Sequence, residues 1–156
     1  MPSILPIGYI DVSYLTALLL TKRKPMLEGG VIHVTDALLG EWPTLKKTCV
    51  ALAGLATRVN DGVVPRLAKV TIERLKPLEI EDWAKGDGIE LVLPLVVCPG
   101  MVLYAEADTW GPLPGAAFAR ISGVLWSLAN HGTAQSILLR ARIDGDRDEL
   151  PASFEE

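Results

Sequence analysis

The pattern of apolar and polar residues over the first third of the chain predicts extended structure before the first helix. Residues 4–12 alternate loosely and contain a proline and a glycine, so we expect an edge strand or an extended arm. Residues 14–21 fit either a helix or a strand by periodicity, and we favour a strand. A wide hairpin through the basic turn at residues 22–25 then leads to a strand at residues 31–34.

Two later segments have the three- and four-residue spacing that is typical of helices. Thr35 and Asp36 offer an N-cap and a first-turn acid for a helix that ends at residues 60–62. The apolar stripe of this helix consists of Leu45, Cys49, Leu52, Ala53, Ala56 and Val59. A second, more buried helix is predicted over residues 116–129, with a left-handed stop at residues 130–132. Its stripe consists of Phe118, Ile121, Leu125 and Leu128.

Most of the remaining chain reads as strands. Residues 68–73 and 137–143 alternate between apolar and polar side chains, as a half-exposed strand does. The apolar runs 89–97 and 101–107 predict two strands joined by a tight turn, and the polar residues 76–87 predict a loop. This order lacks the regular βαβ alternation of a parallel sheet. We therefore predict a single α+β domain, a mostly antiparallel sheet packed with two main helices.

The composition agrees with one folded domain. The chain has 156 residues, of which 49% are hydrophobic and 22% charged, and its mean hydropathy is +0.30. These values exclude intrinsic disorder and a disulfide-dense scaffold, and the apolar excess favours a surface for self-association or for a membrane. We divide the chain into an N-terminal arm or edge strand at 1–12, a globular α+β domain at 13–143 and an acidic tail at 144–156.

The negative charge is concentrated in the tail. Of 19 acidic and 15 basic residues, the tail holds six acids and one arginine, so the rest has 14 basic and 13 acidic side chains, a net of +1. A nearly neutral body gives no field that steers it to nucleic acid, so we expect no direct sequence-specific nucleic-acid binding. Four tail carboxylates follow part of the spacing of a calcium loop, but Glu149 occupies the glycine position, so a solvated tail is the preferred interpretation.

No specific catalytic or metal motif is present. Phosphate-binding loops and the nucleophile-elbow pattern are absent, and His33 and His131 are isolated from each other along the chain. We interpret Cys49 and Cys98 as buried thiols in a reducing compartment. We therefore predict no catalytic residue, no metal and no cofactor.

The acidic loop and the hydropathy profile carry two further expectations. Glu79, Glu81 and Asp82 lie in a polar loop, where we see no apolar pocket that would raise a pKa. The chain starts without a recognisable secretory signal, and its longest apolar run, residues 91–105, is too interrupted to span a membrane. We expect a protein of the cytoplasm.

Two surface features are candidates for contacts with partners. Lys22, Arg23 and Lys24 form a basic cluster, most simply a solvated loop, with contact to anionic lipid or a nucleoprotein as the functional hypothesis. Trp110 stands in a loop made rigid by proline and glycine, where a tryptophan can anchor an interface.

The order of these features resembles the matrix proteins of rhabdoviruses and related negative-strand RNA viruses. The residues that carry the resemblance are the basic turn at 22–25, the helix that opens at Thr35 and carries Trp42, the loop with Trp110 and the helix at 116–130. The resemblance implies a non-enzymatic protein that self-associates into a layer between membrane and nucleocapsid, and a location in the virion interior. It also implies a terminal arm that docks on a neighbouring copy, here formed by Pro2, Ile4, Leu5, Ile7 and Tyr9.

Two hypotheses from different classes follow. The first is a self-associating structural protein, most sharply a viral matrix protein, whose partners are itself, an anionic membrane surface and a nucleoprotein. A subunit of a phage or bacterial protein assembly would self-associate for the same physical reasons, and the sequence does not separate it from the first hypothesis. The alternative is a small cytosolic enzyme or ligand-binding domain with a pocket between sheet and helices. We favour the first, because few polar groups fall within the predicted core and a catalytic pocket needs convergent ones.

Overall fold

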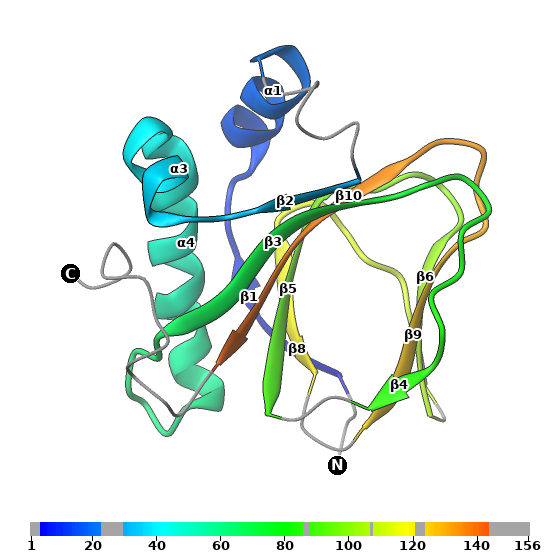
Figure 1. Ribbon diagram of the computed structural model, residues 1–156. Helices are drawn as coiled ribbons and strands as arrows, with labels where there is room; N and C mark the ends of the chain where they lie inside the picture. The colour runs from blue at the N-terminus through cyan, green and yellow to red at the C-terminus, as the bar shows by residue number, and fades with distance from the viewer. Residues whose placement is uncertain (1–3, 23–29, 86–87, 107, 121–123, 144–156) are drawn as a thin grey trace.

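The computed structural model describes residues 4–22, 30–85, 88–106, 108–120 and 124–143. In these residues the strands form two antiparallel sheets (Figure 1). The six-stranded sheet has the order β1 (Ile4–Tyr9), β8 (Ala116–Arg120), β5 (Ile89–Val96), β10 (Ser136–Ile143), β3 (Leu67–Leu75), β2 (Val31–His33). The four-stranded sheet has the order β4 (Ala84–Lys85), β9 (Leu125–Asn130), β6 (Met101–Ala105), β7 (Asp108–Trp110).

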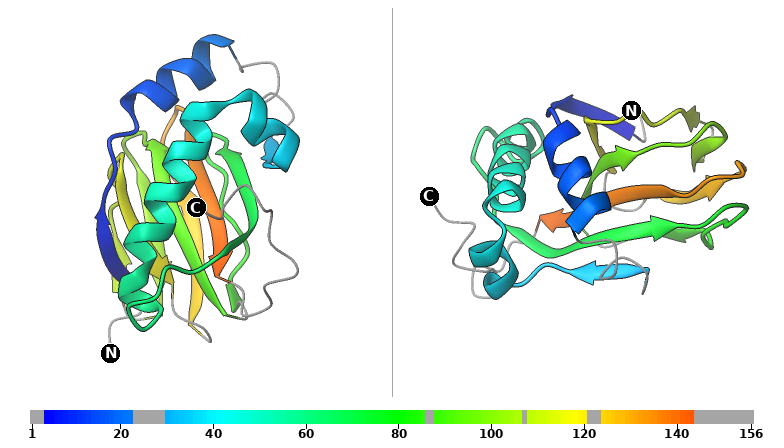
Figure 2. Two further views of the ribbon diagram at one scale, coloured as in Figure 1. Left: turned by 90° about the vertical axis from the view of Figure 1, so that its left-hand side faces the viewer. Right: turned by 90° about the horizontal axis from the view of Figure 1, so that it is seen from above.

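The helices lie on one side of the six-stranded sheet and the four-stranded sheet lies on the other (Figures 1 and 2). Among the residues that the structure describes, the helical elements are α1 (Ser13–Lys22), α3 (Asp36–Glu41), α4 (Pro43–Leu55) and the 3₁₀ helix η1 (Ala56–Val59). In the left view of Figure 2, α4 crosses the face of the larger sheet. No described helix is both long and apolar enough to cross a membrane.

The six-stranded sheet is buried on both faces, so it contributes to two hydrophobic cores. On β10, Ile137, Leu139 and Ala141 face the helices, whereas Leu138 faces the smaller sheet, as the two-residue alternation of a strand requires. The helix-side core includes Ile7, Leu15, Leu19, Leu39, Leu45, Leu52, Leu91 and Leu93. The core between the sheets includes Ile4, Val92, Leu103, Phe118, Trp126 and Leu128. The molecule is therefore a two-sheet sandwich with a helical layer on one side.

The predicted edge strand at the N-terminus is confirmed. Strand β1 pairs with β8 at the edge of the larger sheet, with a register shift between Pro6 and Gly8. Ile4 and Ile7 are fully packed, one in each core. In this fold the segment is thus an integral strand of its own chain.

The predicted strand at residues 14–21 is wrong, because these residues form helix α1. Leu15 and Leu19 are spaced by one helical turn and both are buried against the helix-side core. Leucine and alanine dominate the segment, and they favour helices over strands. The carboxylate of Asp11 accepts hydrogen bonds from the backbone N–H of Ser13 at 3.0 Å and from its hydroxyl at 2.7 Å, which fixes the start of the helix.

The first predicted helical stretch is confirmed, including the restart that Pro43 predicts. Thr35 caps α3, since its hydroxyl oxygen accepts a hydrogen bond from the N–H of Leu38 at 3.2 Å. Trp42 separates α3 from α4, and Pro43 stands at the first position of the new helix, where a missing N–H costs nothing. The helical stretch closes at Asn60, as predicted.

The second predicted helix, residues 116–129, is wrong, because this segment forms β8 and β9. Strand β8 is covered by helices on one face and by the other sheet on the opposite face, so both faces are apolar and the two-residue alternation is lost. Apolar residues in such a strand follow no fixed spacing. Here their spacing happened to match the three- and four-residue spacing of a helix. Consequently residues 130–132 form no helix stop: Asn130 ends β9, and residues 131–132 lead on toward β10.

The predicted strands at 89–97 and 101–107 exist, but they are not a hairpin. Residues 98–100 carry the chain from the six-stranded sheet to the four-stranded sheet, so β5 and β6 do not pair. Gly100 has a φ of 99°, and a Cβ there would lie 2.8 Å from the backbone nitrogen of Gly132, so this crossing needs glycine.

The fold class is therefore corrected in part. The chain is a small, mostly antiparallel domain with few helices, as predicted. With two stacked sheets and only one of the two predicted main helices, it is more β than α+β.

Candidate functional site

Arg140 of β10 lies at the centre of a charged cluster between the two sheets. Its Nε donates to Oε1 of Glu90 at 2.7 Å, and its Nη1 donates to Oε1 of Glu81 at 2.7 Å. Its Nη1 also lies 3.3 Å from Oε2 of Glu73. The side chain of Arg140 is 16% exposed, so these carboxylates take the place of water around a largely buried cation.

Strand register explains why these side chains meet. Glu73 of β3 lies opposite Leu138, and Glu90 of β5 lies opposite Arg142. Both glutamates are therefore diagonal neighbours of Arg140 on the face that looks toward the smaller sheet. Glu81 comes from the segment that precedes β4, so it reaches the cluster from the other sheet.

Arg120 of β8 extends the cluster and is almost completely buried, at 2% exposure. Its Nη2 donates to Oε2 of Glu90 at 3.3 Å, and its Nη1 donates to the carbonyl oxygen of Val124 at 3.4 Å. Its Nε is buried without a hydrogen-bond partner in the described structure. The guanidinium carbons of Arg120 and Arg140 lie 4.9 Å and 5.5 Å from the ring centroid of Trp126, within the range of cation–π attraction.

The cluster shifts the pKa of two of its members. Burial raises the pKa of Glu81, and the neighbouring Glu73 and Glu90 carboxylates raise it further, whereas Arg140 opposes the shift. Burial alone would lower the pKa of Arg140, but Glu90, Glu81 and Glu73 together hold it above its ordinary value. Arg140 is thus a permanent cation, and the Glu81 carboxyl takes up a proton more readily than an exposed glutamate does.

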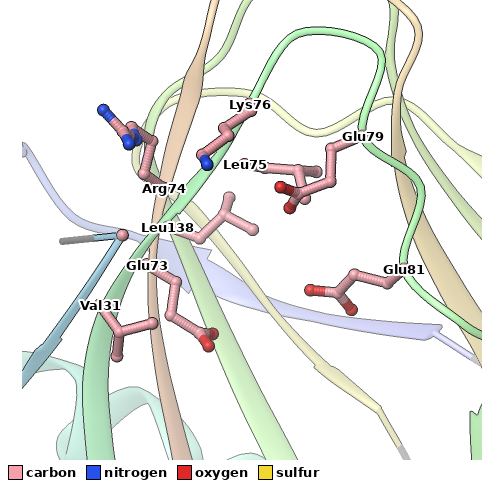
Figure 3. A pocket seen from close by; sticks show the side chains of 9 residues that line it. Val31, Glu73, Arg74, Leu75, Lys76, Glu79, Glu81 and Leu138 are labelled. Carbon is pink, nitrogen blue, oxygen red and sulfur yellow. The ribbon is translucent and has the colours of Figure 1, made fainter. Parts of the chain in front are cut away.

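Two pockets border the cluster and share Glu81. One has a volume of about 280 Å³ and is lined by Gly30, Val31, Glu73, Arg74, Leu75, Lys76, Glu79, Glu81 and Leu138. Figure 3 shows the carboxyl groups of Glu73, Glu79 and Glu81 around it. The other has a volume of about 200 Å³ and is lined by Glu81, Asp82, Ala84, Glu90, Arg120, Trp126, Arg140 and Arg142. Together they expose a cluster of charges to small molecules from two sides.

Sequence reasoning missed most of this site. Arg120 was assigned to a helix, Arg140 to the polar face of a strand, and Glu73 and Glu90 were given no role. The expectation that no pocket raises the pKa of Glu81 is wrong, because Glu81 is buried in this cluster. The available signal was an arginine inside an otherwise apolar strand, since a buried arginine needs carboxylates nearby.

Of the predicted basic cluster, only Lys22 is among the described residues, and it lies away from this site. Lys22 is exposed at the end of α1, where it lines a pocket of about 510 Å³ between α1 and the start of α4. Arg23 and Lys24 lie outside the described residues. Binding of an anionic surface or a nucleoprotein by this cluster stays a prediction.

The residues predicted for self-association are dispersed. Ile4 and Ile7 are buried in this chain's own cores, Leu5 is half-buried, and Tyr9 is 68% exposed. Trp110 ends β7 and packs half-buried against the core between the sheets. Pro2, like the acidic tail, lies outside the described residues. Self-association stays a prediction.

Among the described residues, the remaining candidates do not gather into a reactive or metal-binding site. Cys49 and Cys98 are free and buried, as predicted, and burial raises the pKa of the Cys49 thiol to about 12. Nε2 of His131 lies 2.9 Å from the hydroxyl oxygen of Tyr104, apart from the cluster. Across the described residues, no three histidine, cysteine or carboxylate side chains gather in a way that could hold a metal ion. Between the sheets, Arg120 and Arg140 pair with the carboxylates of Glu73, Glu81 and Glu90.

No protein-family model and no curated protein matches this chain. Solved structures that resemble it include a cupin domain from Bordetella pertussis, with 20% identity and a TM-score of 0.45 over 53% of this chain and 88% of that one. A predicted oxalate decarboxylase from Thermotoga maritima matches with 17% identity and a TM-score of 0.45, over 56% and 72% of the two chains. A salicylate 1,2-dioxygenase from Pseudaminobacter salicylatoxidans matches with 21% identity and a TM-score of 0.44, over 52% of this chain and 22% of that one.

These observations correct the resemblance to viral matrix proteins, which is wrong. The resemblance depended on a helix at residues 116–130, and that segment is two strands in different sheets. Several of the solved structures that the chain resembles are named as cupin proteins. The expectation of a non-enzymatic structural protein in a virion depended on the matrix-protein resemblance and falls with it.

Proposed function

We propose that this chain is a small-molecule-binding domain or a small enzyme whose site is the Arg–Glu cluster between the two sheets. The observation that carries the proposal is the convergence of five charged side chains, one of them buried and four partly buried, on two adjoining pockets. These are Glu73, Glu81, Glu90, Arg120 and Arg140. They come from β3, β5, β8, β10 and the segment before β4, so only the folded chain assembles them.

A purely structural role explains the cluster less well. Buried ion pairs are costly to desolvate, and well-packed hydrophobic residues often replace them without loss of stability. The face that holds the cluster is otherwise built from residues such as Leu138, Val92 and Phe118, which pack without charges. Polar groups that converge from several elements on one pocket are typical of ligand sites.

The cluster also has the electrostatics that acid–base chemistry uses. A carboxyl whose pKa is raised by burial, next to a fixed cation, is a common arrangement in enzymes. Two of the matched structures are named as a dioxygenase and a predicted decarboxylase, but their TM-scores are below 0.5, so the proposal rests on the cluster and its pockets.

The location differs from the pocket between sheet and helices that we considered from the sequence. The helix-side pockets are the one of about 510 Å³ near Trp42 and one of about 390 Å³ near Thr16. Neither is lined by a buried set of paired charges among the described residues. The space between the sheets is therefore the better candidate.

A steric block of one pocket tests the proposal. Ala84 is exposed, lines the 200 Å³ pocket and pairs with Trp126 across β4 and β9, so Ala84→Leu narrows the pocket without removing a charge. The full chain is first screened by thermal shift with small acids, amines, amides and sugars. A ligand at 100 times its Kd stabilises the folded state by about 2.7 kcal/mol, which a thermal shift detects.

Ala17→Leu is the matched control, because Ala17 is exposed and lines the pocket of about 390 Å³ on the helix side. We expect at least tenfold weaker binding of the screened ligand by the Ala84→Leu variant and unchanged binding by Ala17→Leu. Equal binding by both variants, or no stabilisation by any compound class, contradicts the proposal.

A further inference from the structure

Arg120 is the member of the cluster with unused hydrogen-bonding capacity. Its two hydrogen bonds measure 3.3 Å and 3.4 Å, beyond the usual range for N–H donors to oxygen, whereas Arg140 makes two at 2.7 Å. Its Nε is buried and has no partner in the described residues. A buried donor that is left without an acceptor costs free energy, so an acceptor that enters the pocket gains by meeting it.

The surroundings of Arg120 fix the orientation of its guanidinium group. The guanidinium carbon lies 4.9 Å from the ring centroid of Trp126, and Oε2 of Glu90 contacts one end of the group at 3.3 Å. A guanidinium group that is already held in place loses little conformational entropy when it forms two parallel hydrogen bonds to a planar anion.

Pocket size and charge limit what can bind there. A volume of about 200 Å³ exceeds the roughly 150 Å³ cavity that admits benzene, so the pocket holds a molecule of that size. Trp126 and Ala84 provide apolar contacts for its body. The charged lining residues are Glu81, Asp82, Glu90, Arg120, Arg140 and Arg142, three of each sign. A balanced lining accommodates one additional negative charge more easily than the two of a phosphate dianion.

We infer that the ligand of this site is a small organic monocarboxylic acid whose carboxylate is bound by Arg120. The inference rests on the proposed function and specifies its ligand class. The body of the ligand lies against Trp126, and its carboxylate oxygens accept hydrogen bonds from the under-bonded guanidinium group. Glu81 does not oppose this strongly, because burial raises the pKa of its carboxyl and makes its negative charge easier to lose.

Matched acids and amides test the inference on the unaltered protein. Acetate, propionate and benzoate are titrated calorimetrically against the full chain, next to acetamide, propionamide and benzamide, which have the same shapes without the charge. We expect at least one acid to bind at least tenfold more tightly than its amide. Inorganic phosphate is titrated as the competing anion and should bind more weakly than that acid.

The Arg120→Lys variant then tests whether Arg120 contacts the ligand carboxylate, because lysine keeps the positive charge but lacks the planar pair of donors. We expect at least tenfold weaker binding of the acid by this variant. Arg58→Lys, at an exposed position of η1 on the helix side, is the control and should change binding by less than twofold.

The outcomes separate this inference from the proposed function. Amides that bind as well as acids, or phosphate that binds better, overturn the carboxylate class and leave a small-molecule site in place. Binding of the acid by Arg120→Lys equal to that of the wild type overturns the role of Arg120. If no acid binds while the thermal-shift screen finds another compound that Ala84→Leu rejects, only the inference fails.

Discussion

Arg140 shows how the interior between two apolar sheets holds a cation. Burial removes water from the guanidinium group, and Glu90, Glu81 and Glu73 replace that water with three carboxylates. Because Glu90 is shared with Arg120, its two oxygens are divided between two arginines. Because of this division, the hydrogen bonds of Arg120 are weaker than those of Arg140.

The raised pKa of Glu81 gives the stability of the protein a defined pH dependence. The unfolded chain protonates Glu81 near its ordinary value of 4.5, and the folded chain protonates it at higher pH. Between these two values the folded state binds more protons, so its stability falls as the pH rises. The advantage of wild type over Glu81→Gln in free energy of unfolding is therefore fully present below about pH 4.5. It is lost as the pH rises through the pKa that Glu81 has in the folded chain.

Urea unfolding of wild type and Glu81→Gln at a series of pH values measures this difference. Glu79→Gln, which removes a glutamate from the same segment, controls for the change in net charge. A difference between wild type and Glu81→Gln that stays constant, or that grows with pH, contradicts the burial of Glu81.

At the scale of single elements, the backbone of Gly115 connects the end of β1, the start of β8 and strand β5. Gly115 has a φ of 80°, its carbonyl oxygen accepts from the N–H of Ile10 at 2.8 Å, and its N–H donates to the carbonyl oxygen of Pro94 at 2.9 Å. A Cβ at this position would overlap the carbonyl oxygen of Ile10 and lie 2.7 Å from the ring of Tyr9. Both the backbone conformation and the space therefore require glycine.

Gly115→Ala should destabilise the protein by about 2 kcal/mol or more, because strain and overlap add. Gly111→Ala, in the same loop, is the matched control: nothing lies within 4 Å of its Cβ, and its backbone is outside the left-handed region. We expect that variant to remain within about 0.5 kcal/mol of wild type. Urea unfolding compares the two variants, and equal stabilities would refute the packing of β1 against this loop.

The elements also show which parts of the fold could be predicted from the sequence. Strand β3 has a clear two-residue alternation, and α3 has a capping threonine, so local signals identify both. Strand β8 is buried on both faces, and its apolar residues carry no period that distinguishes a strand from a helix. The buried arginine of β8 was a signal that charges gather there, but its partners could not be predicted, because Glu73, Glu90, Arg120 and Arg140 meet only through the strand order and register.

At the scale of the whole molecule, the central sheet joins the two cores into one structure. Strands β5, β8 and β10 contribute side chains to the helix-side core from one face and to the core between the sheets from the other. Neither the helical layer nor the smaller sheet has a second surface to pack on in the described structure (Figures 1 and 2). The charged site depends on this sharing, since its arginines come from the same strands.

Neighbouring leucines on β10 test whether the two cores unfold together. Leu138 packs between the sheets and Leu139 packs against the helices, and both are almost fully buried. Replacing either by alanine should cost about 2–5 kcal/mol. If the shared sheet makes the domain one cooperative unit, each substitution lowers hydrogen-exchange protection equally in α4 and in β9. Loss of protection in β9 alone for Leu138→Ala, with α4 unchanged, would instead mean that the smaller sheet opens independently, and that the charged site opens to solvent with it.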